Sequence, residues 1–320
     1  MRQLLFFICL GLFLTKSCIG QGIVDEMPCD IIQNQYYQKV VTAEIDYYTG
    51  HFLTAYQTLN ELDNSCGLAN SVIYQELYFY ACLSLLLKET ASALYAIKRL
   101  VTAYGYTLSD FKSCANYSTL KKSRDWLKVK REILSLSQTF VSDTATFSFF
   151  DEIIKSDQEC RRQYIDSCEL YKADTTNLIR FKNYYLTVFD SVDDVNCQKL
   201  ISFLKASSNR KFHLSDYHRR RIYFGLLAVT THLSNSNKAD SLLYAITEQI
   251  KIRNLAPEFY AAFVDRQKLN ANEKYIYGFY DNAVPNKIED FQNIDVRRLS
   301  IGLPSYELEK QLKQIKKGSN

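Results

Sequence analysis

GHFLTAYQTLNEL, residues 50–62, is repeated 38 positions later as KETASALYAIKRL, residues 88–100. The equivalent positions are Ala55 and Ala93, Leu59 and Ile97, and Leu62 and Leu100. A small residue followed by large apolar residues four and seven positions later forms one apolar face of an α-helix. Because the pattern occurs twice at a fixed period, it predicts two stacked helical hairpins between about residues 31 and 136.

Residues that interrupt helices are scarce along the whole chain. It has 10 glycines and 4 prolines in 320 residues, about a third of the roughly 12% expected from average usage. β-Sandwiches, barrels and glycine-rich nucleotide-binding folds depend on such residues, so the composition argues against them. Hydrophobic residues make up 47% of the chain and aromatic residues 14%, which is enough for one or two buried cores. The expected fold class is therefore all-α.

Small residues and helix ends extend the match beyond the two repeated stretches. In the helices before them Ala43 aligns with Ala81, and after them Gly67 aligns with Gly105. With these positions the segment resembles a pair of tetratricopeptide repeats, although its period of 38 is longer than the usual 34 and most of the usual aromatic and proline positions differ. The resemblance implies hairpins that bind a protein or peptide partner. An ordinary antiparallel bundle is the alternative.

The chain beyond the hairpins is expected to cap and extend them, because an array of this kind usually needs three hairpins. Residues 102–133 resemble the exit helix found behind short repeat arrays in secreted bacterial proteins, with Leu120 and Trp126 as its anchors. A polar joint beginning at Asp143 predicts a boundary between a hairpin domain at 21–142 and a second, mainly helical domain at 143–320.

Amphipathic stretches predict the helices of the second domain. They are expected at 147–172, 176–190, 195–206, 216–233, 238–254 and 257–269. Pro257 suits the first turn of the last of these helices. An irregular segment at 270–304 follows, and a short helix at 306–317 closes the chain.

The first 20 residues, MRQLLFFICLGLFLTKSCIG, have the layout of a secretory signal peptide. Arg2 precedes an uninterrupted apolar run from Leu4 to Leu14, and small residues follow it. The run spans about half of a bilayer core, so it is too short for a transmembrane helix. We expect cleavage after Gly20 and a soluble mature protein that is secreted or periplasmic. Acylation of Cys18, as in a lipoprotein, is the alternative.

Removal of the signal peptide leaves seven cysteines and lowers the formal net charge from +4 to +2, because Arg2 and Lys16 are lost. An odd number leaves at least one thiol free or paired between chains, and an oxidising compartment permits one or two disulfides. The sequence has no C-x-x-C motif, and we expect neither a metal nor a cofactor. A mature chain this close to neutral does not favour nucleic acid as a partner.

The standard enzyme signatures are missing from the sequence, among them glycine-rich phosphate-binding loops, H-E-x-x-H and G-x-S-x-G. The histidines are His51, His213, His218 and His232. The basic cluster consists of Arg210, Lys211, Arg219, Arg220 and Arg221. It either holds an anionic ligand or forms a solvated face near the start of a helix.

Polar residues of the second domain follow one another in a recognisable order. The motifs are D-Q-E-C-R at 157–161, His232 after an apolar stretch, A-A-F-V-D-R at 261–266, Y-G at 277–278 and R-R-L-S-I-G-L at 297–303. In this order they resemble the uncharacterised bacterial family named domain of unknown function 6624, over residues 147–308. The resemblance implies candidate site residues and no reaction: Asp157, Gln158, Arg161, His232, Asp265, Arg266, Tyr277, Arg297 and Arg298.

The chain departs from the family pattern on both sides of Tyr277. Tyr275 stands where a glutamine is usual, and Phe279 and Tyr280 stand where polar residues are usual. A glycine-containing turn between the second and third helices is replaced by residues 207–210, SSNR. If the family has an active site, part of it could therefore be lost in this chain.

Two interpretations of the candidate residues stay open. In a catalytic site, His232 exchanges protons near neutral pH, and Asp157 or Asp265 orients it or acts as a base. The other six candidates then bind an anionic substrate, chiefly through their guanidinium groups. In a structural interpretation the same residues form ion pairs and cap helix ends.

Three functions are compatible with these patterns. An extracytoplasmic interaction protein, whose hairpins bind a partner, is the first expectation because no complete catalytic signature is present. An enzyme of the hydrolase or transferase class, acting on an anionic substrate through His232, is the second. A scaffold without a site is the third.

Overall fold

The computed structural model describes residues 30, 35–68, 75–114, 116–122, 124–137, 140–212, 214, 216–280 and 284–318. These residues form thirteen α-helices and no β-strand, which confirms the predicted all-α class. The signal peptide predicted at 1–20, and His213, lie outside them. None of the helices described is both long and apolar enough to cross a membrane.

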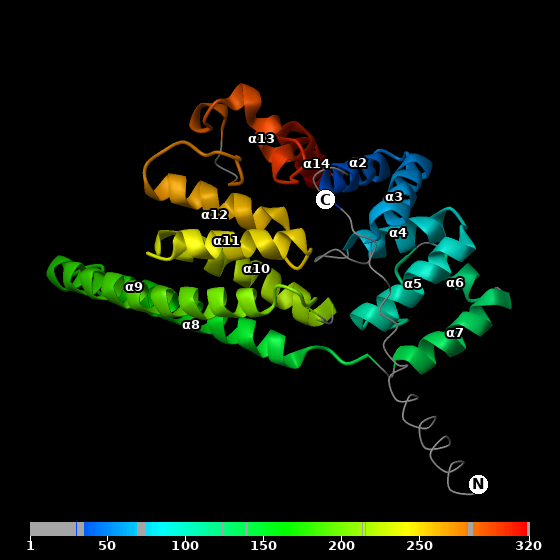
Figure 1. The fold of residues 1–320 in the computed structure, drawn as a ribbon, viewed down its shortest axis with the longest axis horizontal. Coiled ribbons are helices and arrows are strands. Elements are labelled where there is room, and N and C mark those ends of the chain that lie inside the picture. The colour runs from blue at the N-terminus through cyan, green and yellow to red at the C-terminus, as the bar shows by residue number, and fades with distance from the viewer. Residues whose placement is uncertain are drawn as a thin grey trace, which may run out of the picture.

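Two helical hairpins open the described chain (Figure 1). Their helices are α2 (Tyr36–Tyr48), α3 (Phe52–Cys66), α4 (Gln75–Leu86) and α5 (Thr90–Tyr104). α2 packs against α3, α4 packs against α5, and α3 joins the two pairs by packing against α4. All six side chains of the repeated pattern are fully buried, so the pattern marks the inner faces of the hairpins.

Glycines follow the second helix of each hairpin. Gly67 follows α3 with a φ of +72°, and Gly105 follows α5 with a φ of +66°, in the region that favours glycine. At Gly105 an added Cβ would lie only 2.7 Å from the ring of Phe140. Gly50, between α2 and α3, has a φ of +86° and open space around it.

Alanine substitutions at Gly105 and Gly50 distinguish the energetic cost of backbone strain from that of steric contact. We expect Gly105→Ala to lower the free energy of unfolding by about 2 kcal/mol or more, because contact with Phe140 adds to a left-handed strain of about 1–2 kcal/mol. Gly50→Ala is the matched control, which should lose only the strain. Urea unfolding measures both losses. Equal losses would show that Phe140 moves aside at no cost.

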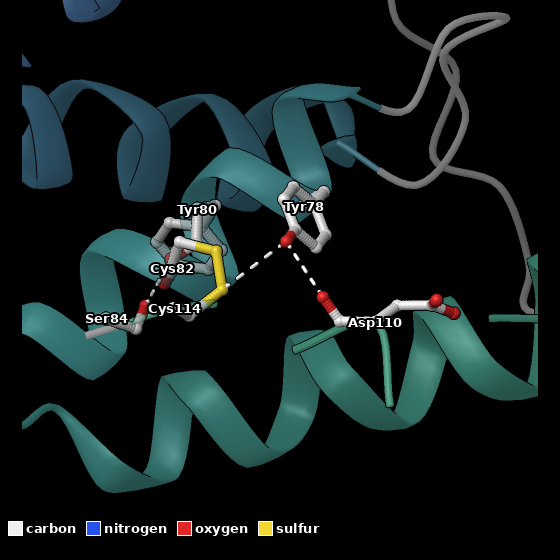
Figure 2. Close-up of a disulfide and its surroundings, with 6 residues drawn as sticks. All are labelled: Tyr78, Tyr80, Cys82, Ser84, Asp110 and Cys114. Carbon is white, nitrogen blue, oxygen red and sulfur yellow. Dashed lines mark hydrogen bonds between the residues drawn. A yellow bond between two sulfur atoms is a disulfide. The ribbon is translucent and has the colours of Figure 1, made fainter. Parts of the chain in front are cut away.

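A disulfide ties the turn after α5 to α4. Cys82 and Cys114 are joined, with their Cα atoms 5.2 Å apart (Figure 2). One turn before Cys82, the Tyr78 hydroxyl donates to the Asp110 carbonyl at 3.0 Å, which adds a second tie at the same place. Cys66 is also disulfide-bonded. The free thiols in the part of the chain that is described are Cys160, Cys168 and Cys197.

Two further helices cover the outside of the second hairpin. They are α6 (Tyr117–Leu120) and α7 (Arg124–Ser137), and α7 packs against α5. Leu120 and Trp126, the predicted anchors, are both buried. The Trp126 ring meets the Tyr117 ring edge-on, with their centroids 5.7 Å apart. This part of the chain therefore closes one side of the hairpin core.

Five further helices build the other half of the molecule in stacked layers (Figure 1). They are α8 (Thr144–Leu170), α9 (Thr175–Ala206), α10 (Asp216–His232), α11 (Ala239–Lys251) and α12 (Pro257–Asn270). α8 packs against α9 and α10, α11 packs against α9, and α12 packs against α10 and α11. α11 ends three residues before its predicted end, because Arg253 adopts a φ of +62°.

α9 corrects the prediction of two separate helices at 176–190 and 195–206. It is one helix of 32 residues. Its polar middle resembles a break in the sequence, but Asp193 and Asn196 point to side chains of α8 and not to solvent alone. The polarity of this stretch therefore comes from contacts across the helix pair.

Where the structure describes it, the segment predicted as irregular at 270–304 contains only short helical pieces after the end of α12. They are two 3₁₀ turns, Pro285–Lys287 and Phe291–Asn293, and α13 (Ile294–Ser300). α14 (Tyr306–Gly318) then packs against α2, so the C-terminus lies beside the first described helix (Figure 1). Just before α14, the backbone N–H of Ser305 donates to Gln38 Oε1 at 2.7 Å. The last helix thus returns the chain to its beginning.

The core continues across the joint predicted at 143. One hydrophobic cluster extends from Tyr36 in α2 to Phe263 in α12. Arg253, between α11 and α12, donates to the carbonyls of Cys66 at 2.8 Å and Gly67 at 3.2 Å. The end of α3 is therefore held by the second half of the chain.

A carboxyl group is buried where the two halves meet. Glu258, in the first turn of α12, has an Oε2 atom that is inaccessible and accepts no hydrogen bond from the described residues. Burial raises the pKa of Glu258 to about 7, and the carboxylates of Glu309 in α14 and Glu76 in α4 add to the rise, while its own backbone N–H and Arg298 oppose it.

Glu258 should make stability fall as pH rises. The folded chain holds the proton more tightly than the unfolded chain, so the stabilisation is complete below the unfolded pKa of about 4.3 and is lost as pH rises to about 7. The expected loss is about 3 kcal/mol. Urea unfolding across this range measures it.

Glu258→Gln should abolish this loss, because the amide is neutral at every pH. Glu61→Gln, at an exposed position of α3, is the control and should keep it. If the native chain and Glu258→Gln lose the same free energy of unfolding between these pH values, Glu258 is not the group responsible.

Candidate functional site

A fully buried carboxylate lies at the centre of the candidate site. Asp157, on α8, has no exposed surface, and His232 ends α10 directly opposite it. His232 Nδ1 lies 3.0 Å from both carboxylate oxygens of Asp157. Because a carboxylate only accepts hydrogen bonds, His232 carries its proton on Nδ1 and donates it to Asp157. Gln158 Nε2 donates to the same carboxylate at 2.7 Å.

Within the described chain, only one nitrogen of the His232 imidazole, Nδ1, has a hydrogen-bond partner. Its side chain is 25% exposed. No residue of the described chain pairs with Nε2, which therefore presents a lone pair toward solvent. An imidazole oriented in this way can accept a proton on Nε2, while the carboxylate behind it stabilises the imidazolium that forms.

Arg161 lies one turn beyond Asp157 on α8 and links it to α9. Its Nη1 is 3.4 Å from an Asp157 oxygen, and its Nη2 is 3.1 Å from each oxygen of Asp193. The guanidinium also lies over the ring of Phe189, 5.0 Å from its centroid. Arg161 is thus occupied by two carboxylates, and its charge serves to balance them.

Asp193 and Asn196 belong to this cluster and were not among the residues selected from the sequence. Burial raises the pKa of Asp193, and the nearby Asp157 charge adds to the rise, whereas Arg161 opposes it. Asn196 is buried and accepts from the Ser156 hydroxyl at 3.0 Å. The signal that could have found them is their spacing, because residues three apart on a continuous helix share a face.

Cys160 lies between Asp157 and Arg161 in the sequence but does not add a nucleophile. The thiol is buried, and burial raises its pKa. Its Sγ donates to the Asp157 carbonyl at 3.1 Å. Since the thiolate is the reactive form of cysteine, this environment makes the side chain inert.

Asp265 stands apart from His232 and organises a loop. The carboxylate is fully buried and accepts three backbone hydrogen bonds, from Ile276 at 2.7 Å, Tyr277 at 2.9 Å and Phe279 at 2.7 Å. Burial raises its pKa, and the three N–H groups oppose that rise. Asp265 therefore shapes residues 276–279 and has no oxygen exposed for proton transfer.

Arg297 and Arg298 hold the same loop through its carbonyl groups. Arg297 donates to Ile276 at 3.1 Å and to the carbonyl of Asp290 at 3.1 Å. Arg298 is buried and donates to Tyr277 at 2.7 Å and to Pro304 at 2.7 Å, and it pairs with Glu309. These guanidinium groups are hydrogen-bonded within the protein. A substrate would have to displace their present partners before it could bind them.

Tyr277 is also part of this second group. Its ring is buried and packs edge-on against Tyr260, with their centroids 5.9 Å apart. Burial raises the pKa of its hydroxyl, with further contributions from Tyr260 and Asp265. The contacts thus divide the candidates between a cluster around His232 and a cluster around residues 276–279. Arg266, on α12, belongs to neither set of hydrogen bonds.

The basic cluster is largely occupied by internal partners. Arg210 pairs with Asp143, Lys211 donates to the Ile252 carbonyl, and Arg221 pairs with Asp151 at 3.1 Å. Arg219 donates to the carbonyl of Leu214 at 3.0 Å and to that of Phe212 at 2.6 Å. The side chain of Arg220 lies outside what the structure describes. The cluster therefore joins α8, α10 and the turn after α11.

No family model, curated protein or solved structure matches this chain. The resemblance to domain of unknown function 6624 stays a prediction, and the arrangement of the residues themselves is what supports a function.

The balance of charge around Asp157 predicts a large effect of removing it. Asp157→Asn leaves Arg161 and His232 facing a neutral amide in a partly buried site, so we expect the free energy of unfolding to fall by about 3 kcal/mol. Urea unfolding at neutral pH measures the change. Glu159→Gln, an exposed carboxylate of the same helix, is the control and should change it by less than about 0.5 kcal/mol. Similar values for both variants would contradict the central role of Asp157.

Proposed function

We propose that this protein is an enzyme in which His232 acts as a general acid and base. The observation that carries the proposal is the pairing of His232 Nδ1 with both oxygens of the fully buried Asp157, while Nε2 has no partner in the described chain. A purely structural ion pair would not need an imidazole with one nitrogen open to solvent. The pairing fixes the tautomer that a general base requires.

The chemistry of the dyad fits a hydrolase or a transferase. Nε2 removes a proton from water or from an acceptor hydroxyl as that oxygen attacks the substrate. His232 is then an imidazolium, held by the negative charge of Asp157. Nε2 returns the proton to the leaving group when its bond breaks, so the imidazole is neutral again at the end of the cycle. Arg161 keeps the two carboxylates paired throughout and needs no contact with substrate.

An extracytoplasmic location fits this proposal. The support is the apolar leader in the sequence together with the Cys82–Cys114 disulfide, because disulfides persist in oxidising compartments. We propose that the mature protein begins after Gly20 and is secreted or periplasmic.

Binding of a protein partner by the hairpins has less support from the structure. α14 lies along α2, and α7 lies along α5, so the chain itself covers faces of two of the four hairpin helices. A partner would have to use the surfaces that remain.

Loss of His232 should abolish turnover. A panel of p-nitrophenyl acetate, butyrate and phosphate is incubated with the native protein and with His232→Asn, and release of nitrophenolate is followed at 405 nm (about the absorbance maximum). We expect His232→Asn to lower the rate about 100- to 10,000-fold. His51→Asn, at a histidine whose side chain is 68% exposed, is the control and should retain the native rate. Equal rates in His232→Asn and the native protein would overturn the proposal.

The tautomer of His232 provides a readout that needs no substrate. Long-range ¹H–¹⁵N spectra should show the neutral imidazole protonated on Nδ1. A proton on Nε2 would contradict the proposed geometry even if the panel contained no substrate.

A further inference from the structure

Arg266 is a cation without a partner among the residues that the structure describes. It is half-buried on α12, and it makes no hydrogen bond, ion pair or ring contact within the described chain. The other half-buried or buried arginines that the structure describes, Arg99, Arg161, Arg219, Arg253, Arg297 and Arg298, all bind carboxylates or carbonyl groups. A guanidinium that is partly removed from water gains from a bidentate anion. Arg266 is therefore available to bind an anionic group that the described residues do not supply.

One face of α12 places Arg266 opposite the end of α10. Ala262, Arg266 and Asn270 are four residues apart, so they share this face. At its beginning, the Tyr280 hydroxyl donates to the Ala262 carbonyl at 3.1 Å and lies beside the Thr231 side chain. Since helical side chains lean toward the N-terminus, Arg266 lies over the turn where Tyr280 binds.

The other end of this face is fixed to the residues that follow His232. Asn270 Nδ2 donates to Asn235 Oδ1 at 2.7 Å and reaches Ser234 Oγ at 3.4 Å. Arg266 thus lies between one contact to Thr231 and another to Ser234 and Asn235. His232 lies in the chain between Thr231 and Ser234, so the end of α10 runs past this face of α12.

Tyr280 contributes a neutral hydroxyl beside Arg266. Burial raises the pKa of Tyr280 to about 12, although the charge of Arg266 opposes the rise. The hydroxyl therefore stays protonated and does not neutralise the guanidinium. Asp265, the neighbouring carboxylate, is already occupied by three backbone N–H groups.

We propose that Arg266 binds an oxyanion group of the substrate, a carboxylate or a phosphate, and presents the bond to be broken to His232. The proposal rests on the acid–base function of His232. It narrows the class of substrate to anions. Among the arginines considered above, it assigns recognition of the anionic group to Arg266 alone, because the others already bind groups within the protein.

Anion binding can be measured without the natural substrate. Inorganic phosphate and acetate are titrated separately into the native protein and each variant by isothermal titration calorimetry, and the Nε–H signal of Arg266 is followed in native protein labelled with ¹⁵N-arginine. We expect saturable shifts, with affinity about 10- to 100-fold lower in Arg266→Gln, as loss of a charged hydrogen bond implies. Arg266→Lys should recover part of the affinity. The anion that binds with the higher affinity identifies the chemical group that Arg266 recognises.

Arg180→Gln is the matched control, because Arg180 is an exposed arginine of α9 that also lacks an ion pair. It should leave both affinities unchanged. Equal affinities in the native protein and Arg266→Gln, or no response of the Arg266 signal to either anion, would overturn the assignment.

The His232 tautomer separates this proposal from the one on which it rests. In Arg266→Gln the proton should remain on Nδ1, because Asp157 is untouched. A correct tautomer together with unchanged anion affinity refutes only the role of Arg266. Anion binding that depends on Arg266 together with a proton on Nε2 refutes only the acid–base function.

Discussion

The buried charge of Asp157 is the constraint on which the second half of the molecule depends. An unpaired carboxylate without contact to water would cost several kcal/mol, so the fold has to bring compensating groups to it. Gln158 and Arg161 come from the same helix and are available locally. His232 comes from α10, 75 residues along the chain, and its approach requires α8 and α10 to pack side by side. The arrangement that balances the charge is also the one that orients the imidazole.

A second buried carboxylate, Asp265 in α12, does comparable work. Asp265 collects three backbone N–H groups from residues 276–279, a stretch that has no helix of its own to satisfy them. Arg298 binds a carbonyl of the same loop and also pairs with Glu309 in α14. Charged groups therefore hold the loop through both its N–H and its C=O groups. Its fixed position brings Tyr280 back to α12, beside Arg266.

Much of the fold could be predicted from local patterns. The all-α class follows from the scarcity of glycine and proline, and the hairpin core follows from six side chains at helical spacing, all of which are fully buried. The prediction of a break inside α9 was wrong. Its polar residues suggest exposure to solvent, whereas Asp193 accepts a hydrogen bond from Arg161 on α8. A sequence pattern identifies which residues are polar, but their partners across a helix pair are non-local.

For the site, the sequence by itself determined which residues are candidates and on which segments they lie, Asp193 and Asn196 excepted. Asp157, Gln158 and Arg161 share a helix, so their proximity follows from the geometry of one turn. Only the tertiary structure decided that His232 joins them and that Asp265, Arg297 and Arg298 serve a loop instead. It also left Arg266 without a partner in the part of the chain that the structure describes. The physical reason is that the role of a charged side chain depends on the groups that compensate its charge. In this protein those groups come from segments that are distant in the sequence and that only packing brings together.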